Sequence, residues 1–192
     1  ARLYWGGRID DDNSNYANRG TVSIRKAAGA YATVNAGVQI DQTLLTGDQY
    51  AYQAYQDVTA FVNTNGAGSY TVANVATTTG SVGGGGNYGG WALVVVYENL
   101  TLPYSSVRVY DGFVRVENNA TQAIQLTGLN APGTPVLASD AYMSTMAWEG
   151  DGNLAATAQN PAGDYIKVNG TAVSNAVNPI TNFWNGTISK NG

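Results

Sequence analysis

The chain has 192 residues, of which 44% are hydrophobic and 11% charged, and its formal net charge is −4. This length suits one domain and the apolar content can fill a core, so we expect residues 1–192 to form a single ordered domain. The nine basic residues are scattered over an acidic chain, which argues against nucleic acid as a partner.

The chain contains no histidine and no cysteine. These absences exclude Ser-His and Cys-His nucleophiles, histidine-ligated zinc and disulfides. Carboxylate chemistry remains, and a glycosidase would need two carboxyl groups facing each other across a cleft. Most Asp and Glu residues stand beside Gly or Asn in expected turns, where they serve the local backbone. We therefore expect a protein that is not an enzyme.

No apolar run approaches the roughly 20 residues that cross a bilayer; the longest is residues 91–97, so we expect no membrane span. The chain begins at Ala1 without an initiator Met, which fits a mature exported protein. An extracellular location is expected.

The first residues, 1–7, form a short apolar segment before a polar loop. Leu3, Tyr4 and Trp5 are candidates for an assembly strand, one that completes the sheet of a neighbouring copy, as in donor-strand complementation. The alternative is an edge strand within the chain's own domain. Both interpretations stay open at this point.

Period-two alternation of apolar and polar residues predicts most of the regular structure. Residues 91–97 are apolar without alternation, which predicts a central strand buried on both faces. Asp111-Gly112 and Asn169-Gly170 are hairpin signals. The expected strands cover residues 21–24, 31–34, 38–40, 69–75, 91–97, 107–109, 113–116, 123–126, 165–168 and 180–188. We therefore predict an all-β fold, a β-sandwich or jelly roll with long Gly/Asn-rich loops and at most one or two short helices.

Residues 50–61 fit two patterns. Tyr50, Ala54, Val58 and Phe61 would share one face of a helix, whereas the near-alternating tyrosines also fit a strand. On an exposed strand, Tyr50, Tyr52 and Tyr55 would form a strip on which a sugar ring stacks.

Two loops are rich in the oxygen ligands that calcium prefers. One carries Asp10, Asp12 and Ser14, and the other carries Glu149 and Asp151. Neither completes an EF-hand loop, and the alternative for both is an exposed acidic loop. The expectation is thus no cofactor, with calcium as the candidate ion.

Four N-x-S/T sequons would permit glycan attachment if the host has the machinery. They begin at Asn99, Asn119, Asn169 and Asn185.

The segment YGGWALVVVYENLTLPYSSVRVYDGF, residues 88–113, resembles a motif of large bacterial and archaeal cell-surface, adhesin-like proteins. Further blocks of similarity lie at residues 55–59, 68–75, 149–151, 163–164 and 178–189, so the resemblance spans roughly residues 50–190. It implies a secreted surface domain without enzymatic activity.

A single domain of this kind gains reach by self-assembly. We therefore expect a structural subunit of a pilus-like filament or surface array, with other copies of itself as the main partner. The alternative is an adhesin module that binds a carbohydrate or a cell-surface protein.

Overall fold

The computed structural model describes residues 1–80, 86–117, 120–130, 141–152 and 163–189. Within them the regular structure is dominated by antiparallel β-strands, with one short α-helix, α1 (Thr59–Asn65), and one 3-10 turn, η1 (Tyr16–Asn18). The expected all-β fold with at most two short helices is confirmed. The sandwich or jelly-roll topology stays a prediction.

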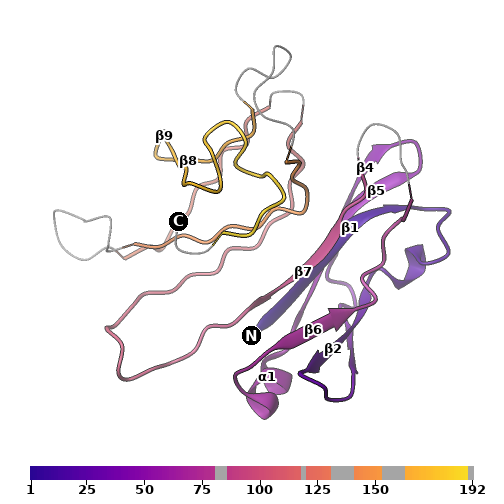
Figure 1. Cartoon of the computed structure of the whole chain (residues 1–192), viewed down its shortest axis with the longest axis horizontal. Helices are drawn as coiled ribbons and strands as arrows, with labels where there is room; N and C mark the ends of the chain where they lie inside the picture. The colour runs from indigo at the N-terminus through magenta and orange to yellow at the C-terminus, as the bar shows by residue number, and fades with distance from the viewer. Residues whose placement is uncertain (81–85, 118–119, 131–140, 153–162, 190–192) are drawn as a thin grey trace. The chain divides into compact units, whose positions relative to one another are not determined.

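The larger sheet, sheet A, contains four antiparallel strands in the order β4-β5-β1-β7 (Figure 1). Its strands are β1 (Arg2–Asp10), β4 (Ile40–Thr46), β5 (Gln49–Asp57) and β7 (Gly89–Val94). β1 pairs with β5 along its whole length and with β7 from Arg2 to Gly7. β1 is therefore an interior strand.

Sheet B has the order β3-β2-β6 and consists of β2 (Thr21–Lys26), β3 (Ala32–Asn35) and β6 (Tyr70–Ala73). These strands confirm the alternation seen at residues 21–24, 31–34 and 69–75.

A two-stranded hairpin is formed by β8 (Lys167–Val168) and β9 (Thr171–Ala172). Asn169 and Gly170 connect them with φ angles of 48° and 83°, the left-handed conformation that a two-residue hairpin turn requires. The Asn-Gly signal is confirmed.

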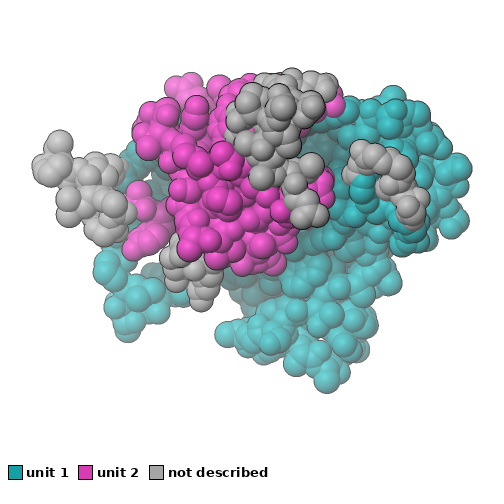
Figure 2. All heavy atoms as spheres, turned by 45° about the horizontal axis from the view of Figure 1, so that its top comes forward, with its two compact units in different colours: residues 1–115, 126–136 teal, residues 116–125, 137–192 magenta. Residues whose placement is uncertain are grey.

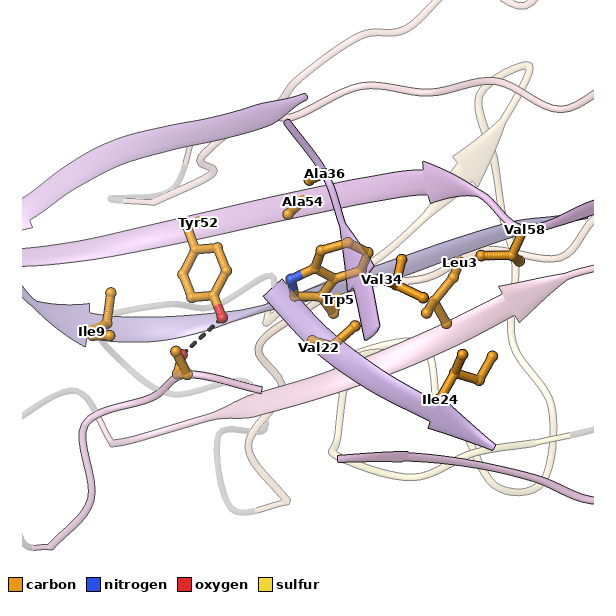
Figure 3. Packing of buried hydrophobic residues seen from close by; sticks show 11 residues of the cluster. Leu3, Trp5, Ile9, Val22, Ile24, Val34, Ala36, Tyr52, Ala54 and Val58 are labelled. Atoms are coloured by element: carbon orange, nitrogen blue, oxygen red, sulfur yellow. Dashed lines mark hydrogen bonds between the residues drawn. The ribbon is translucent and has the colours of Figure 1, made fainter. Parts of the chain in front are cut away.

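The hydrophobic core collects side chains from both sheet A and sheet B (Figure 3). Leu3, Trp5 and Ile9 alternate along β1 and are fully buried. They pack with side chains of β2, β3 and β5, namely Val22, Ile24, Val34, Tyr52 and Ala54. Two polar atoms within this core have partners: Trp5 Nε1 donates to the carbonyl of Arg19 at 2.8 Å, and Tyr52 Oη donates to that of Ala76 at 2.8 Å.

The segment expected to be the central strand is instead the end of sheet A. β7 stops at Val94, and Val96 is 55% exposed, so burial of both faces is wrong for this strand. The reason is that β7 has a described strand neighbour on one side only, and the chain leaves the ladder after Val94.

Residues 50–61 resolve into a strand followed by a helix: β5 ends at Asp57 and α1 begins at Thr59. The carboxylate of Asp57 accepts a hydrogen bond from the backbone N–H of Thr59 at 2.8 Å, which stabilises the first turn of α1. Residues 49–57 form a strand and not a helix because β5 pairs with both β4 and β1.

The strands expected at residues 107–109, 113–116, 123–126 and 180–188 are absent from the described residues. At the Asp111-Gly112 corner the physical reason is visible, since Asp111 bonds to two side chains of β1 and not across a hairpin. The sequence also predicts a glycine-rich loop at residues 80–90 and a strand or short helix at residues 136–146. Of these, residues 81–85 and 136–140 lie outside the described residues.

The chain groups into two compact units (Figure 2): unit 1 contains residues 1–115 and 126–136, and unit 2 contains residues 116–125 and 137–192. Sheets A and B belong to unit 1, and the β8–β9 hairpin belongs to unit 2. The expectation of a single domain stays a prediction. Within the described ranges, no helix is long and apolar enough to cross a membrane.

Replacement of Trp5 by alanine tests the role of β1. The change empties a large buried volume and removes the donor to Arg19, so the free energy of unfolding should fall by about 3–5 kcal/mol. Urea denaturation followed by circular dichroism measures it. Val38→Ala is the control, because Val38 is 97% exposed and its loss should change stability by less than about 0.5 kcal/mol. A loss below about 1 kcal/mol for Trp5→Ala would contradict a core position for β1.

Candidate functional site

The expected assembly residues lie in the middle of sheet A. Leu3 and Trp5 point into the core, and Tyr4 is buried on the opposite face of the same strand. The edge-strand interpretation is wrong, because β5 and β7 of the same chain pair with β1 on its two sides. The donor-strand role stays a prediction, and it would require that another copy supply β1 between β5 and β7.

The face of sheet A opposite the core is covered by the segment around Asp111. The Asp111 carboxylate accepts hydrogen bonds from Arg2 and from the Tyr4 hydroxyl. Burial, followed by the hydrogen bond to Asp111, raises the pKa of Tyr4. Nearby on β5, Gln53 Nε2 donates to the carbonyl of Gly112 at 3.3 Å. The segment is thus held on the sheet by polar contacts.

The three tyrosines of β5 do not form one exposed strip. Tyr52 is fully buried, and burial raises its pKa. Tyr55 lies on the opposite face, with its ring 5.8 Å from that of Tyr4. The ring of Tyr50 lies 5.8 Å from that of Tyr16. β5 therefore has no continuous tyrosine surface on which a sugar ring could stack.

The N-terminal acidic loop has the geometry of an ordinary turn. Asp12 and Ser14 are exposed, and Asp10 ends β1 with its N–H donating to Thr78 Oγ1 at 2.9 Å. The turn is closed by Asn13, whose N–H bonds to the carbonyl of Asp10 at 3.1 Å. These local bonds favour the exposed-loop alternative for residues 10–15.

The second acidic loop is part of a tertiary cluster in unit 2. A parallel bridge links Asp164 to Asn182, and Asn182 Nδ2 donates to the carbonyl of Gly152 at 3.2 Å. The N–H of Trp184 donates to Asp164 Oδ1 at 3.0 Å. The structure thus gathers the loop of residues 149–152, Asp164 and residues 182–184 into one place, which we call the acidic cluster.

Glu149 interacts with both other carboxylates of the acidic cluster. Partial burial, followed by hydrogen bonding to Asp151 and by the charges of Asp151 and Asp164, raises the pKa of Glu149 to about 7. All the charged neighbours that act on this carboxyl group are themselves acids. Glu149 and Asp151 remain exposed at the surface, so small solutes can reach them.

Three of the four sequons lie in described residues. Asn99 and Asn169 are exposed, and Asn169 sits at the tip of the β8–β9 hairpin. Asn185 is half-buried, and its Nδ2, the atom that would carry a glycan, donates to the carbonyl of Val177 at 2.7 Å. Asn119 lies outside the described residues. Glycosylation at all four stays a prediction.

Sequence reasoning missed Asp111, Asp164 and Asn182 as interacting residues. The Asp111-Gly112 pair predicts a hairpin turn, so the sequence contains no sign that Asp111 makes a tertiary contact. Asp164 and Asn182 lie in two of the blocks that resemble surface proteins, residues 163–164 and 178–189, and this resemblance was the available signal.

Comparison of the chain with models of protein families, with curated proteins and with solved structures gave no significant match. The resemblance to large cell-surface proteins therefore stays a prediction.

The raised pKa of Glu149 predicts a pH dependence of stability. Between pH 4.5 and about 7 the folded state holds a proton that the unfolded state releases, so the free energy of unfolding falls as pH rises through this window. Glu149→Gln should flatten this decline, measured by thermal denaturation from pH 4.5 to 8. Glu98→Gln, which removes a carboxylate from an exposed segment of unit 1, is the matched control. An unchanged decline in Glu149→Gln would contradict the assignment.

Proposed function

We propose that the chain is a non-enzymatic extracellular structural protein that associates with other copies of itself along the β7 edge of sheet A. The observation that carries the proposal is that no strand among the described residues pairs with the outer side of β7, together with the exposed apolar side chains that follow it. The extracellular and surface setting is supported by the low charge of the chain and by its resemblance to cell-surface proteins.

The β7 edge lacks the features that usually prevent strands from pairing with other molecules. Natural edge strands carry charged residues, proline or a β-bulge. Residues 89–94 contain no charged residue and no proline, and their pairing with β1 runs without a register shift. Trp91 is 38% exposed at this edge.

The β4 edge at the other end of sheet A is protected. Its register with β5 shifts between Leu44 and Thr46, which marks a bulge or irregularity. Arg115 donates to the carbonyls of Leu44 and Leu45 at 2.8 and 3.3 Å. Asp41 adds a charge to this strand. The contrast between the two ends of the sheet favours β7 as the edge for association.

The segment after β7 has the composition of a β-strand, but it pairs with no strand among the described residues. Residues 95–114 contain no helix or strand, yet β-branched and aromatic residues recur along them. Their exposed members include Val95, Val96, Tyr97, Tyr104, Val107 and Val109. Exposed apolar side chains that gather in one segment are a candidate interaction site.

A second copy of the chain is the occupant that we propose for this surface. Residues 95–114 hold only three charged residues, Glu98, Arg108 and Asp111, and Asp111 is paired with Arg2. Electrostatic repulsion between two such segments is therefore weak. An antiparallel pair of β7 edges would extend sheet A across two copies and shield the valines that follow. Repeated association leading to a filament or array would require a further contact beyond this two-copy interface.

The alternative, an adhesin module for carbohydrates, loses part of its structural basis. It depended on an exposed tyrosine strip, and Tyr52 is buried in the core. It stays a prediction for other surfaces of the chain.

A charge placed next to the β7 edge tests the proposal. Val96→Lys should leave the fold intact, because the side chain is 55% exposed, and should weaken self-association at least about tenfold by adding a charged, hydrated side chain beside the apolar edge. Sedimentation velocity over a concentration series measures the association. Val38→Lys is the matched control, since it adds the same charge at an exposed position outside the edge.

Two outcomes would overturn the proposal. One is wild-type protein that stays monomeric at millimolar concentration. The other is association that Val96→Lys and Val38→Lys affect equally.

A further inference from the structure

Two of the sequons fold into the same local turn. Asn99 Oδ1 accepts hydrogen bonds from the backbone N–H of Thr101 at 3.0 Å and from its hydroxyl at 2.8 Å. Asn185 Oδ1 accepts the same two bonds from Thr187. An Asn followed two positions later by Thr is the acceptor sequence for N-linked glycans. The same acceptor turn therefore occurs in two environments, because Asn99 belongs to unit 1 and Asn185 to unit 2.

The bonds to Oδ1 determine the orientation of the Asn99 amide. A backbone N–H can only donate, so the atom that Thr101 contacts is the amide oxygen and not the nitrogen. Nδ2 is the other terminal atom of the planar amide and points away from the N–H of Thr101. In the part of the chain that the structure describes, Asn99 Nδ2 has no hydrogen-bond partner. The atom that would carry a glycan is therefore free.

Asn99 also lies in accessible surroundings. Its side chain is exposed, and the next residue, Leu100, is 90% exposed. The carbonyl of Asn99 accepts a hydrogen bond from the N–H of Leu102 at 3.1 Å, which closes the turn through the backbone and leaves the amide nitrogen unused. A glycan on Nδ2 would thus break no hydrogen bond that the described residues make.

Asn185 differs from Asn99 at this nitrogen. Its Nδ2 donates to the carbonyl of Val177 at 2.7 Å, and its side chain is half-buried. The backbone beside it is crowded, because a Cβ on Gly150 would lie 2.2 Å from the carbonyl oxygen of Trp184, the residue before Asn185. A glycan at Asn185 would have to break the bond to Val177 within this packing.

Asn169 is exposed but lacks the acceptor turn. It is the first of the two residues that connect β8 and β9, and its φ is 48°. Thr171 is held in β9 opposite Val168, and no hydrogen bond joins it to the Asn169 side chain in the described ranges. Of the three described sequons, Asn99 alone combines the turn with an exposed and free nitrogen.

We propose that Asn99 is the residue of the folded chain that carries an N-linked glycan. The donor is an oligosaccharide joined through phosphate to a polyprenyl lipid. Asn99 Nδ2 forms a bond to the anomeric carbon and loses one proton. The bond between that carbon and the phosphate oxygen breaks, and the lipid phosphate leaves with the electron pair. The modification rests on the extracellular location in the proposed function but not on self-association.

Transfer to the purified, folded full chain tests the site without any need for export. The unglycosylated Asn119→Gln variant, which removes the sequon outside the described residues, is incubated with an oligosaccharyltransferase and a polyprenyl-linked oligosaccharide. Intact mass should increase by one glycan, and peptide mapping should locate it at Asn99. Transfer to Asn185 should be at least about fivefold slower, because its bond to Val177 must first break.

Matched variants separate the turn from the sequence. In the same Asn119→Gln chain, Asn99→Gln should abolish the rapid mass increase, whereas Asn185→Gln should leave it unchanged. Thr101→Ser keeps the hydroxyl and should still be modified, but Thr101→Val should not. Residues 99 and 101 are outside the core, so each variant is expected to fold.

Protein isolated from its own cells should carry the glycan at the same residue. Equal transfer to Asn99 and Asn185, preferred transfer to Asn169, or native protein unmodified at Asn99 would refute the proposal. Asn99 lies in the segment of residues 95–114, where a glycan would weaken contact between two copies. Self-association is therefore measured by sedimentation of unglycosylated protein, so failure of one proposal leaves the other unaffected.

Discussion

The pairing of β1 with both β5 and β7 is the constraint on which unit 1 depends. One strand supplies Leu3, Trp5 and Ile9 to the core from one face and Tyr4 to the polar contacts with Asp111 from the other. Because successive side chains of a strand point to opposite faces, a shift of one residue in this register would exchange the two sets. The hydrophobic core and the covering of the opposite face are thus fixed by the same hydrogen-bond ladder.

One face of sheet A packs into the core, and the other face contacts the segment around Asp111. At β4 the edge is irregular and its carbonyls are partly occupied by Arg115, whereas β7 is regular and uncharged. The acidic cluster lies in unit 2, where partial burial and the neighbouring carboxylates Asp151 and Asp164 raise the pKa of Glu149.

The sequence predicted the elements whose structure is local. Alternation located β2, β3 and β6, and Asn169-Gly170 located the last hairpin. The interior position of β1 was not predictable, because its neighbours β5 and β7 lie about 50 and 90 residues away and nothing local specifies them. The apolar residues 91–97 predicted a strand buried on both faces, but β7 ends at Val94 and Val96 is exposed. Hydrophobicity alone does not tell whether a partner strand is present. For the acidic cluster, Glu149 and Asp151 were found as neighbours in sequence, whereas Asp164 and Asn182 join them only through backbone contacts at Gly150 and Gly163.

The separation in sequence between β1 and β7 has a consequence for how the protein folds. Sheet A cannot close until residues 89–94 are available to pair with residues 2–7. Contacts between such distant segments carry a large loop-closure entropy and make folding slow. Until then Leu3 and Trp5 are exposed in an incomplete sheet, and this interval is when the N-terminal segment is most open to pairing with the wrong strand.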